Sequence, residues 1–427
     1  MNGKRLNVIV CDDDVDAARE WGDTINSVPE IDVSARESTL EELSDSLEIL
    51  LERQQTARTK KGASDGNESL FDNADIVFLD YDMLDISNGS YITGQELAYL
   101  VRCYSPCGIV VVMNEGEFAS PAFELRLETP VDHFADLRIS SASLGNPGLW
   151  SSEFIGFRPW SWPILPLEAI SFTERIEVVE LNLDEPVLEV LQMGDFGDWL
   201  SQRAVEALVN RRPLAELHSI TFRDIAMPGT TLGIRPKDIV DESLIPRVAA
   251  ARVSRWLKSL VLPAQDPLID APHLVSRFSS LLGDGRTLSD WNRTAAVTSD
   301  LAALGLGDTP VSDSTFDLTP WSDRALWPWL DISNDPAIPE VAAPWEYDAA
   351  ALVFLEDLSQ FSDRKGALAF ASQVPSMQDI RYVFSDKTPV GERLLEHEKE
   401  RASSYGVDWD SCNPAHVSRS PRLLLAE

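Results

Sequence analysis

The stretch VIVCDDDVD, residues 8–16, decides how the chain begins to fold. Residues 8–11 form a short apolar run that predicts a buried strand, and residues 12–14, all aspartate, follow it directly. Three consecutive carboxylates are compatible with a solvated turn or with a site that binds a cation. The partners of these aspartates further along the chain distinguish between the two interpretations.

Residues 5–165 alternate short apolar runs with helical patterns, which is typical of an α/β domain with a parallel sheet. Amphipathic patterns predict helices over residues 15–27, 38–57, 93–104 and 165–182. A polar, glycine-containing insertion is expected over residues 59–69, and a second insertion over 115–152, which is too long for a simple crossover. The five expected strands are LNVIV, IDVSA, DIVFLD, GIVVVM and EFIGF, at residues 6–10, 31–35, 75–80, 108–113 and 153–157.

Asp80 ends the apolar run of the third expected strand. In an open parallel sheet, ligands bind outside the carboxyl ends of the strands, so Asp12, Asp13 and Asp80 converge if the first and third strands are neighbours. Clustered carboxylates raise one another's pKa values unless a cation holds them, and Mg²⁺ prefers such oxygen ligands. A carboxylate beside Mg²⁺ can act as nucleophile toward a phosphoryl group. The pattern therefore favours a phosphoryl-accepting site.

Four motifs follow one another in the order VIVCDDD, FLDYDML, TGQELAYLVR and FRPW. In this order the first 165 residues resemble the receiver domain of bacterial two-component response regulators. The first motif is similar to the family's first strand with its acidic pair. The second is similar to the phosphoacceptor strand, with Asp80 as acceptor and Met83 at the usual apolar position. The third is similar to the following helix, and FRPW is similar to the Lys-Pro-aromatic turn at the end of the fifth strand.

The resemblance implies a flavodoxin-like fold with five parallel strands and a phosphoprotein that acts in signal transduction. Asp80 would accept phosphate from a sensor histidine kinase or a phosphotransfer protein. Mg²⁺ would lie beside Asp12, held by Asp13, Asp80 and the backbone carbonyl of Asp82. Self-catalysed phosphotransfer to Asp80 and dephosphorylation of it are the only enzymatic activities expected.

The sequence departs from the family pattern at three places. Arg158 stands where the family has Lys, and Leu84 stands where Pro is common. The fourth strand should end in Ser or Thr, but this chain has Met113 and then Asn114. We therefore expect Arg158, helped by Asn114, to sense the phosphate in place of the usual pair.

The carboxyl-terminal part shows mainly helical patterns. We expect a receiver-like domain over residues 1–165, a connecting helix or linker over 166–184, and a mainly α-helical, acidic domain over 185–427, with a possible subdivision near 310–345. This domain would bind an unknown protein partner. Helices are predicted at residues 347–361 and 388–404, among others. Four tryptophans are expected to anchor a loop: Trp321, Trp327, Trp329 and Trp345.

Composition limits the classes of partner. The chain has 36 Lys and Arg against 70 Asp and Glu, a formal net charge of -34 that repels phosphate backbones and predicts no binding to nucleic acid. The sequence shows no membrane span or signal peptide, and its cysteines lack the spacing of a zinc site. We expect a cytoplasmic protein with free thiols.

Three other interpretations stay open. A degenerate receiver would act as a phosphorylation-independent adaptor, which the missing Ser or Thr after the fourth strand favours. A haloacid-dehalogenase-type phosphatase would use the DxD pattern of Asp80 and Asp82, but its DxD belongs on the first strand. A Toprim-like nuclease would need a leading Glu and a surface that tolerates DNA.

Overall fold

The computed structural model describes most of the chain as far as Pro336 and shorter stretches after it. The described residues are 5–28, 31–59, 67–81, 83, 92–114, 134–152, 154, 163–209, 212–226, 242–265, 267–282, 287–336, 338, 352–355, 358–363, 367–371 and 380–383. Some predictions concern residues outside these ranges, namely Asp82, Leu84, Arg158, Trp345 and residues 388–404.

The amino-terminal part contains a five-stranded parallel sheet with the order β2-β1-β3-β4-β5. This is the strand order of flavodoxin-like folds, so the predicted sheet topology is confirmed. Strand β3 is buried along its whole length, as an apolar run in the middle of a parallel sheet should be. The strands are β1 (Leu6–Cys11), β2 (Val33–Glu37), β3 (Ile76–Asp80), β4 (Ile109–Asn114) and β5 (Leu137–Ser140).

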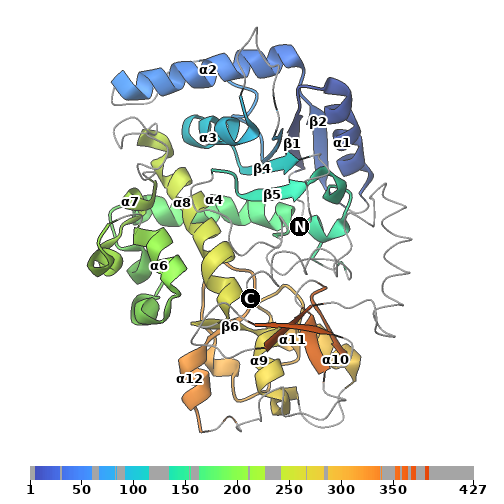
Figure 1. Ribbon diagram of the computed structural model, residues 1–427, viewed down its shortest axis with the longest axis vertical. Coiled ribbons are helices and arrows are strands. Elements are labelled where there is room, and N and C mark those ends of the chain that lie inside the picture. The colour runs from blue at the N-terminus through green and yellow to red at the C-terminus, as the bar shows by residue number, and fades with distance from the viewer. Residues whose placement is uncertain are drawn as a thin grey trace.

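Four helices cover this sheet (Figure 1). Helix α1 packs on β1 and β2, α3 packs on β3 and β4 with α2 beside it, and α4 contacts β4. Asp14 caps the start of α1, and Thr93 forms a capping box with Glu96 at the start of α3. The helices are α1 (Val15–Ser27), α2 (Leu40–Thr59), α3 (Gly94–Tyr104) and α4 (Leu165–Leu181).

The fifth strand differs from the expected one. Residues 137–140, with the sequence LRIS, pair with β4, whereas EFIGF at 153–157 was expected there. The expectation was wrong because LRIS has only two apolar residues and includes Arg138, so it lacks the continuous apolar run that identified the other strands. Residues 141–152, expected to precede the fifth strand, follow it and contain two 3₁₀ turns.

The outer edge of β2 is closed by side chains. Asn26 of α1 donates to the carbonyl of Ala35 (2.8 Å) and accepts from its amide (3.0 Å). Arg5 donates to the carbonyl of Val33 (2.9 Å). Because these backbone groups already have partners, this edge is a poor template for another strand.

The described part of the chain after α4 is largely helical as far as Asn334. Helix α8 is the longest of these helices and is followed by a π-helical turn, Leu257–Val261. The helices are α5 (Val187–Val190), α6 (Gln202–Val209), α7 (Phe222–Ala226), α8 (Ile245–Trp256), α9 (Ala271–Arg277), α10 (Leu288–Arg293), α11 (Leu301–Leu304) and α12 (Trp329–Asn334). The strands β6 (Leu268–Asp270) and β7 (Leu326–Pro328) pair antiparallel.

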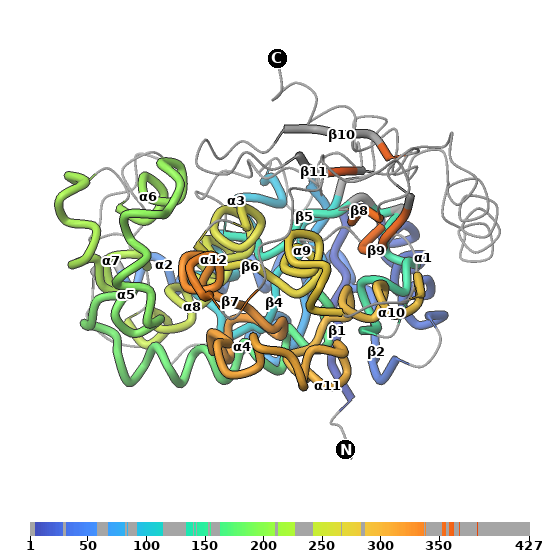
Figure 2. Tube along the Cα trace, turned by 90° about the horizontal axis from the view of Figure 1, so that it is seen from below, coloured from blue at the N-terminus to red at the C-terminus, as the bar shows by residue number. Residues whose placement is uncertain are grey.

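A second sheet lies after these helices, where the sequence predicted a helix over 347–361. Its order is β10-β11-β8-β9, and β8 and β9 pack against α9 and α10 (Figure 2). The predicted helix was wrong because periodicity does not distinguish a helix from a strand in an apolar run as short as LVFL. The strands are β8 (Leu352–Leu355), β9 (Gln360–Asp363), β10 (Leu368–Ala371) and β11 (Ile380–Val383).

One hydrophobic core runs from the first sheet through α4 and α8 to β7 and β9. Trp321 and Trp327 are buried in it, and Trp329 packs on it partly exposed, so the predicted packing role of these three residues is confirmed. The expected loop is wrong for two of them, because Trp327 lies in β7 and Trp329 begins α12. Within the described ranges, no helix combines the length and the apolar character that a membrane crossing requires.

Candidate functional site

Three aspartates meet at the carboxyl end of the first sheet. Asp12 directly follows β1, Asp80 is the last residue of β3, and these two strands are paired with Cys11 opposite Leu79. One oxygen from each of Asp12, Asp13 and Asp80 lies within 4.8 Å of the others. The convergence that the sequence predicted is therefore present, and we call these residues the aspartate trio.

Burial makes the charge of the trio costly. Asp12 and Asp80 are buried, and Asp13 is half-buried. Burial, together with the neighbouring carboxylates of Asp13 and Asp80, raises the pKa of Asp12 to about 7, although a hydrogen bond from the amide of Asp14 (2.8 Å) acts in the opposite direction. A divalent cation would relieve this repulsion. The donor set of close carboxylate oxygens fits a hard ion such as Mg²⁺.

Two helices begin beside the trio. Asp14 caps α1 by accepting from the amides of Asp16 and Ala17, and α3 begins at Gly94, whose amide donates to the carbonyl of Tyr81 (2.8 Å). The amino end of a helix carries partial positive charge and favours an anion nearby. The site thus combines a cation-binding carboxylate set with helix ends that suit a phosphoryl group.

Gly94 allows α3 to approach this edge of the sheet. A Cβ atom at Gly94 would lie 2.0 Å from the carbonyl oxygen of Asp80 and 3.0 Å from the Cα atom of Tyr81. Only glycine fits there without moving the backbone that carries Asp80. The helical pattern of residues 93–104 predicts no special role for this residue, although a glycine directly after Thr93 is a visible signal.

The remaining predicted site residues are not brought to the trio by the described structure. Asp82 and Arg158 lie outside the described residues. Asn114 ends β4 opposite Ser140 of β5, one row beyond the pair Asp80 and Met113, and only its backbone is described. The role of Arg158 and Asn114 in sensing phosphate therefore stays a prediction.

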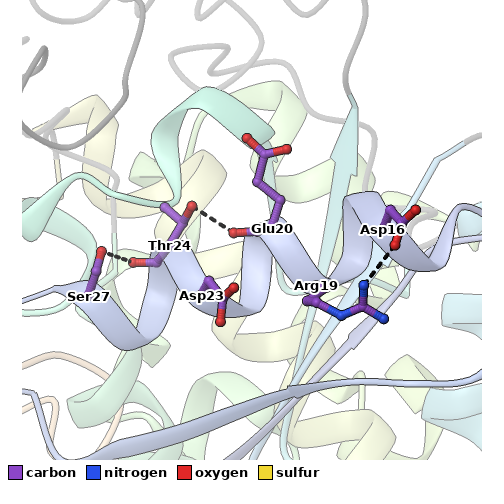
Figure 3. A pocket seen from close by; sticks show the side chains of 6 residues that line it. All are labelled: Asp16, Arg19, Glu20, Asp23, Thr24 and Ser27. Atoms are coloured by element: carbon purple, nitrogen blue, oxygen red, sulfur yellow. Dashed lines mark hydrogen bonds and ion pairs between the residues drawn. The ribbon is translucent and has the colours of Figure 1, made fainter.

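An open hollow lies on the outer face of α1 (Figure 3), formed by side chains that already have local partners. Arg19 pairs with Asp16 (2.7 Å), and Thr24 donates to the carbonyl of Glu20 (2.8 Å). Ser27 donates to the carbonyl of Thr24 (2.7 Å). Since these groups do not converge on a common point, the hollow has no features of a ligand site beyond its shape.

Comparison with known proteins adds no relative. No protein-family model, curated protein or solved structure matches the chain. The five-stranded parallel sheet with its buried aspartate trio is compatible with a receiver domain.

Replacing Asp12 by Asn should stabilise the metal-free protein at pH 8. The change removes one of three mutually repelling carboxylates, and we expect the free energy of unfolding to rise by about 1–3 kcal/mol. Urea titration in the presence of EDTA measures this difference, with Asp23→Asn on the exposed face of α1 as the control. A metal-free Asp12→Asn protein that is less stable than the wild type would contradict the electrostatic account of the trio.

Proposed function

We propose that the chain is a two-component signalling protein that accepts a phosphoryl group on Asp80. The observation that carries this proposal is the aspartate trio at the carboxyl ends of the adjacent parallel strands β1 and β3. Asp12, Asp13 and Asp80 would hold Mg²⁺. When bound, the ion would neutralise the oxygens of the transferring phosphoryl group.

In the proposed reaction a carboxylate oxygen of Asp80 attacks phosphorus. The new O–P bond forms as the bond to the donor breaks, which is P–N in a phosphohistidine and P–O in acetyl phosphate, and the donor leaves with that electron pair. Asp12 and Asp13 keep the negative charge that places the cation beside Asp80. The amino ends of α1 and α3, which begin beside the trio, would add partial positive charge near the transferred group.

The phosphate donor would be a sensor histidine kinase or a phosphotransfer protein. The carboxyl-terminal region would act through contacts with another protein, because a formal net charge of -34 opposes binding to nucleic acid.

The departure at Met113 and Asn114, where a Ser or Thr hydroxyl is usual, favours a second candidate, an adaptor that binds its partner without phosphorylation.

Labelling with acetyl phosphate tests the proposal. The wild type with Mg²⁺ should take up one acid-stable, base-labile phosphoryl group, and Asp80→Asn should lose it, because the amide cannot act as the nucleophile. Phosphate-affinity electrophoresis gives the readout, and Asp23→Asn controls for a general loss of acidic charge.

Two results would contradict phosphorylation at Asp80. The first is label that persists in Asp80→Asn. The second is a wild type that stays unlabelled under conditions that label a control receiver. In the second case the adaptor would be the better function, whereas release of free phosphate without retained label would indicate a phosphatase.

A further inference from the structure

Helix α8 covers the edge of the first sheet opposite the aspartate trio. Arg247 donates to the carbonyl of Cys107 (2.5 Å), just before β4, and Arg255 donates to the carbonyl of Ala135, just before β5. Both carbonyls belong to the amino-terminal ends of their strands. The carboxyl-terminal region therefore contacts the sheet through hydrogen bonds to backbone carbonyls next to its strands as well as through apolar side chains.

The same contact includes a shared aromatic ring. Arg102 of α3 is fully buried, pairs with Asp136 and places its guanidinium carbon 4.9 Å from the centre of the Phe172 ring of α4. The guanidinium carbon of Arg247 lies 5.5 Å from the same ring. Since Phe172 is also buried, α3, α4 and α8 pack around it as one unit.

A buried ion cluster joins α4 to α8 close to this ring. Glu168 accepts from Arg175 within α4 and from Lys258 in the π-helical turn after α8. Arg175 also donates to the hydroxyl of Ser254 (3.1 Å) and to the carbonyl of Pro320 (2.8 Å). We call Glu168, Arg175, Ser254 and Lys258 the Glu168 clasp.

The clasp is costly to open. Glu168 and Arg175 have almost no exposed side-chain surface, and Lys258 is about one quarter exposed. Moving α8 away would leave a charged Glu168 and Arg175 in an apolar interface without the partners on α8, which disfavours partly separated arrangements. Buried ion pairs also restrict docking to one geometry, because a shift in register breaks the paired contacts.

We propose that the first sheet and the region from α4 to the loop at Pro320 form one cooperative body, which the Glu168 clasp holds in a single docked arrangement. The carboxyl-terminal region then works while attached to the sheet, and is not an output module released from it. The proposal does not depend on phosphorylation of Asp80.

Hydrogen exchange of the full chain, followed by mass spectrometry at low urea concentrations, tests the proposal. Peptides from β3, β4 and α8 should converge on one common opening reaction as urea rises, because a cooperative body exposes all of them together. Glu168→Gln should then lower protection in all three by the same factor, about a hundredfold, although the substituted residue belongs to a different element from β3.

Glu174→Gln is the matched control, since it lies on the exposed face of the same helix. Loss of protection in α8 alone, with β3 and β4 unchanged, would overturn the single body. Equal protection in Glu168→Gln and Glu174→Gln would overturn the clasp. If Glu168→Gln does not fold, Lys258→Met is a milder break of the same cluster, and the same comparisons apply.

Discussion

Replacing Gly94 by Ala should lower the free energy of unfolding by about 3 kcal/mol. The added Cβ atom would meet the carbonyl oxygen of Asp80 at 2.0 Å and its carbonyl carbon at 2.9 Å. Both are backbone atoms of a strand that is buried along its length, so relief requires α3 or the end of β3 to move. Because that movement displaces Asp80, we also expect phosphoryl uptake to fall.

The same substitution at two other glycines provides the control for Gly94→Ala. A Cβ atom at Gly22, inside α1, would have only one neighbour at 3.9 Å, and one at Gly194 would have none within 4 Å. Gly22→Ala should stabilise the protein by about 0.5–1 kcal/mol, because glycine is a poor helix former. Urea titrations of the three variants check the order. A Gly94→Ala protein as stable as Gly194→Ala would contradict the close packing of α3 on β3.

Acid should remove a contribution of about 3 kcal/mol that Glu168 makes to stability. Against the cost of its burial, Arg175 and Lys258 lower the pKa of Glu168 from 4.5 to about 2. An acid whose pKa is lowered in the folded state stabilises that state above its unfolded pKa. This stabilisation is fully present above about pH 5 and is lost as pH falls from about 4.5 toward 2.

The difference in unfolding free energy between the wild type and Glu168→Gln isolates this contribution. Urea titrations at several values between pH 3 and pH 7 should give a difference that is constant above pH 5 and shrinks below it. Glu174→Gln should differ little from the wild type at each pH, since Glu174 is exposed. A difference that grows on acidification would mean that Glu168 carries a proton in the folded protein.

The elements with strong local signals could be predicted from the sequence. The strands β1, β3 and β4 are apolar runs, and α3 has a Thr93 cap. The convergence of the aspartate trio could be predicted because its members follow or end two of these strands. Two short strands could not be predicted, because LRIS at 137–140 mixes apolar and polar residues and LVFL at 352–355 is too short to show a period.

Contacts between segments that are distant in the sequence could not be predicted either. Nothing near Glu168 or Lys258 indicates that these residues pair, because they are 90 residues apart and each occurs in an ordinary helical pattern. Gly94 is a similar case: its need for glycine comes from the backbone of Asp80 in another element. Local patterns report local structure, whereas these constraints arise when elements pack together.

The docking of α8 on the sheet sets an order for biosynthesis. Arg247 contacts the carbonyl of Cys107 across 140 residues of sequence. At a translation rate of 5–20 residues per second, roughly 7–30 s pass between the synthesis of these two residues. During that interval the carbonyl of Cys107 lacks its partner on α8, and the ring of Phe172, once synthesised, lacks one of its two cations. A nascent chain that stalls before α8 would therefore expose this surface to chaperones and proteases.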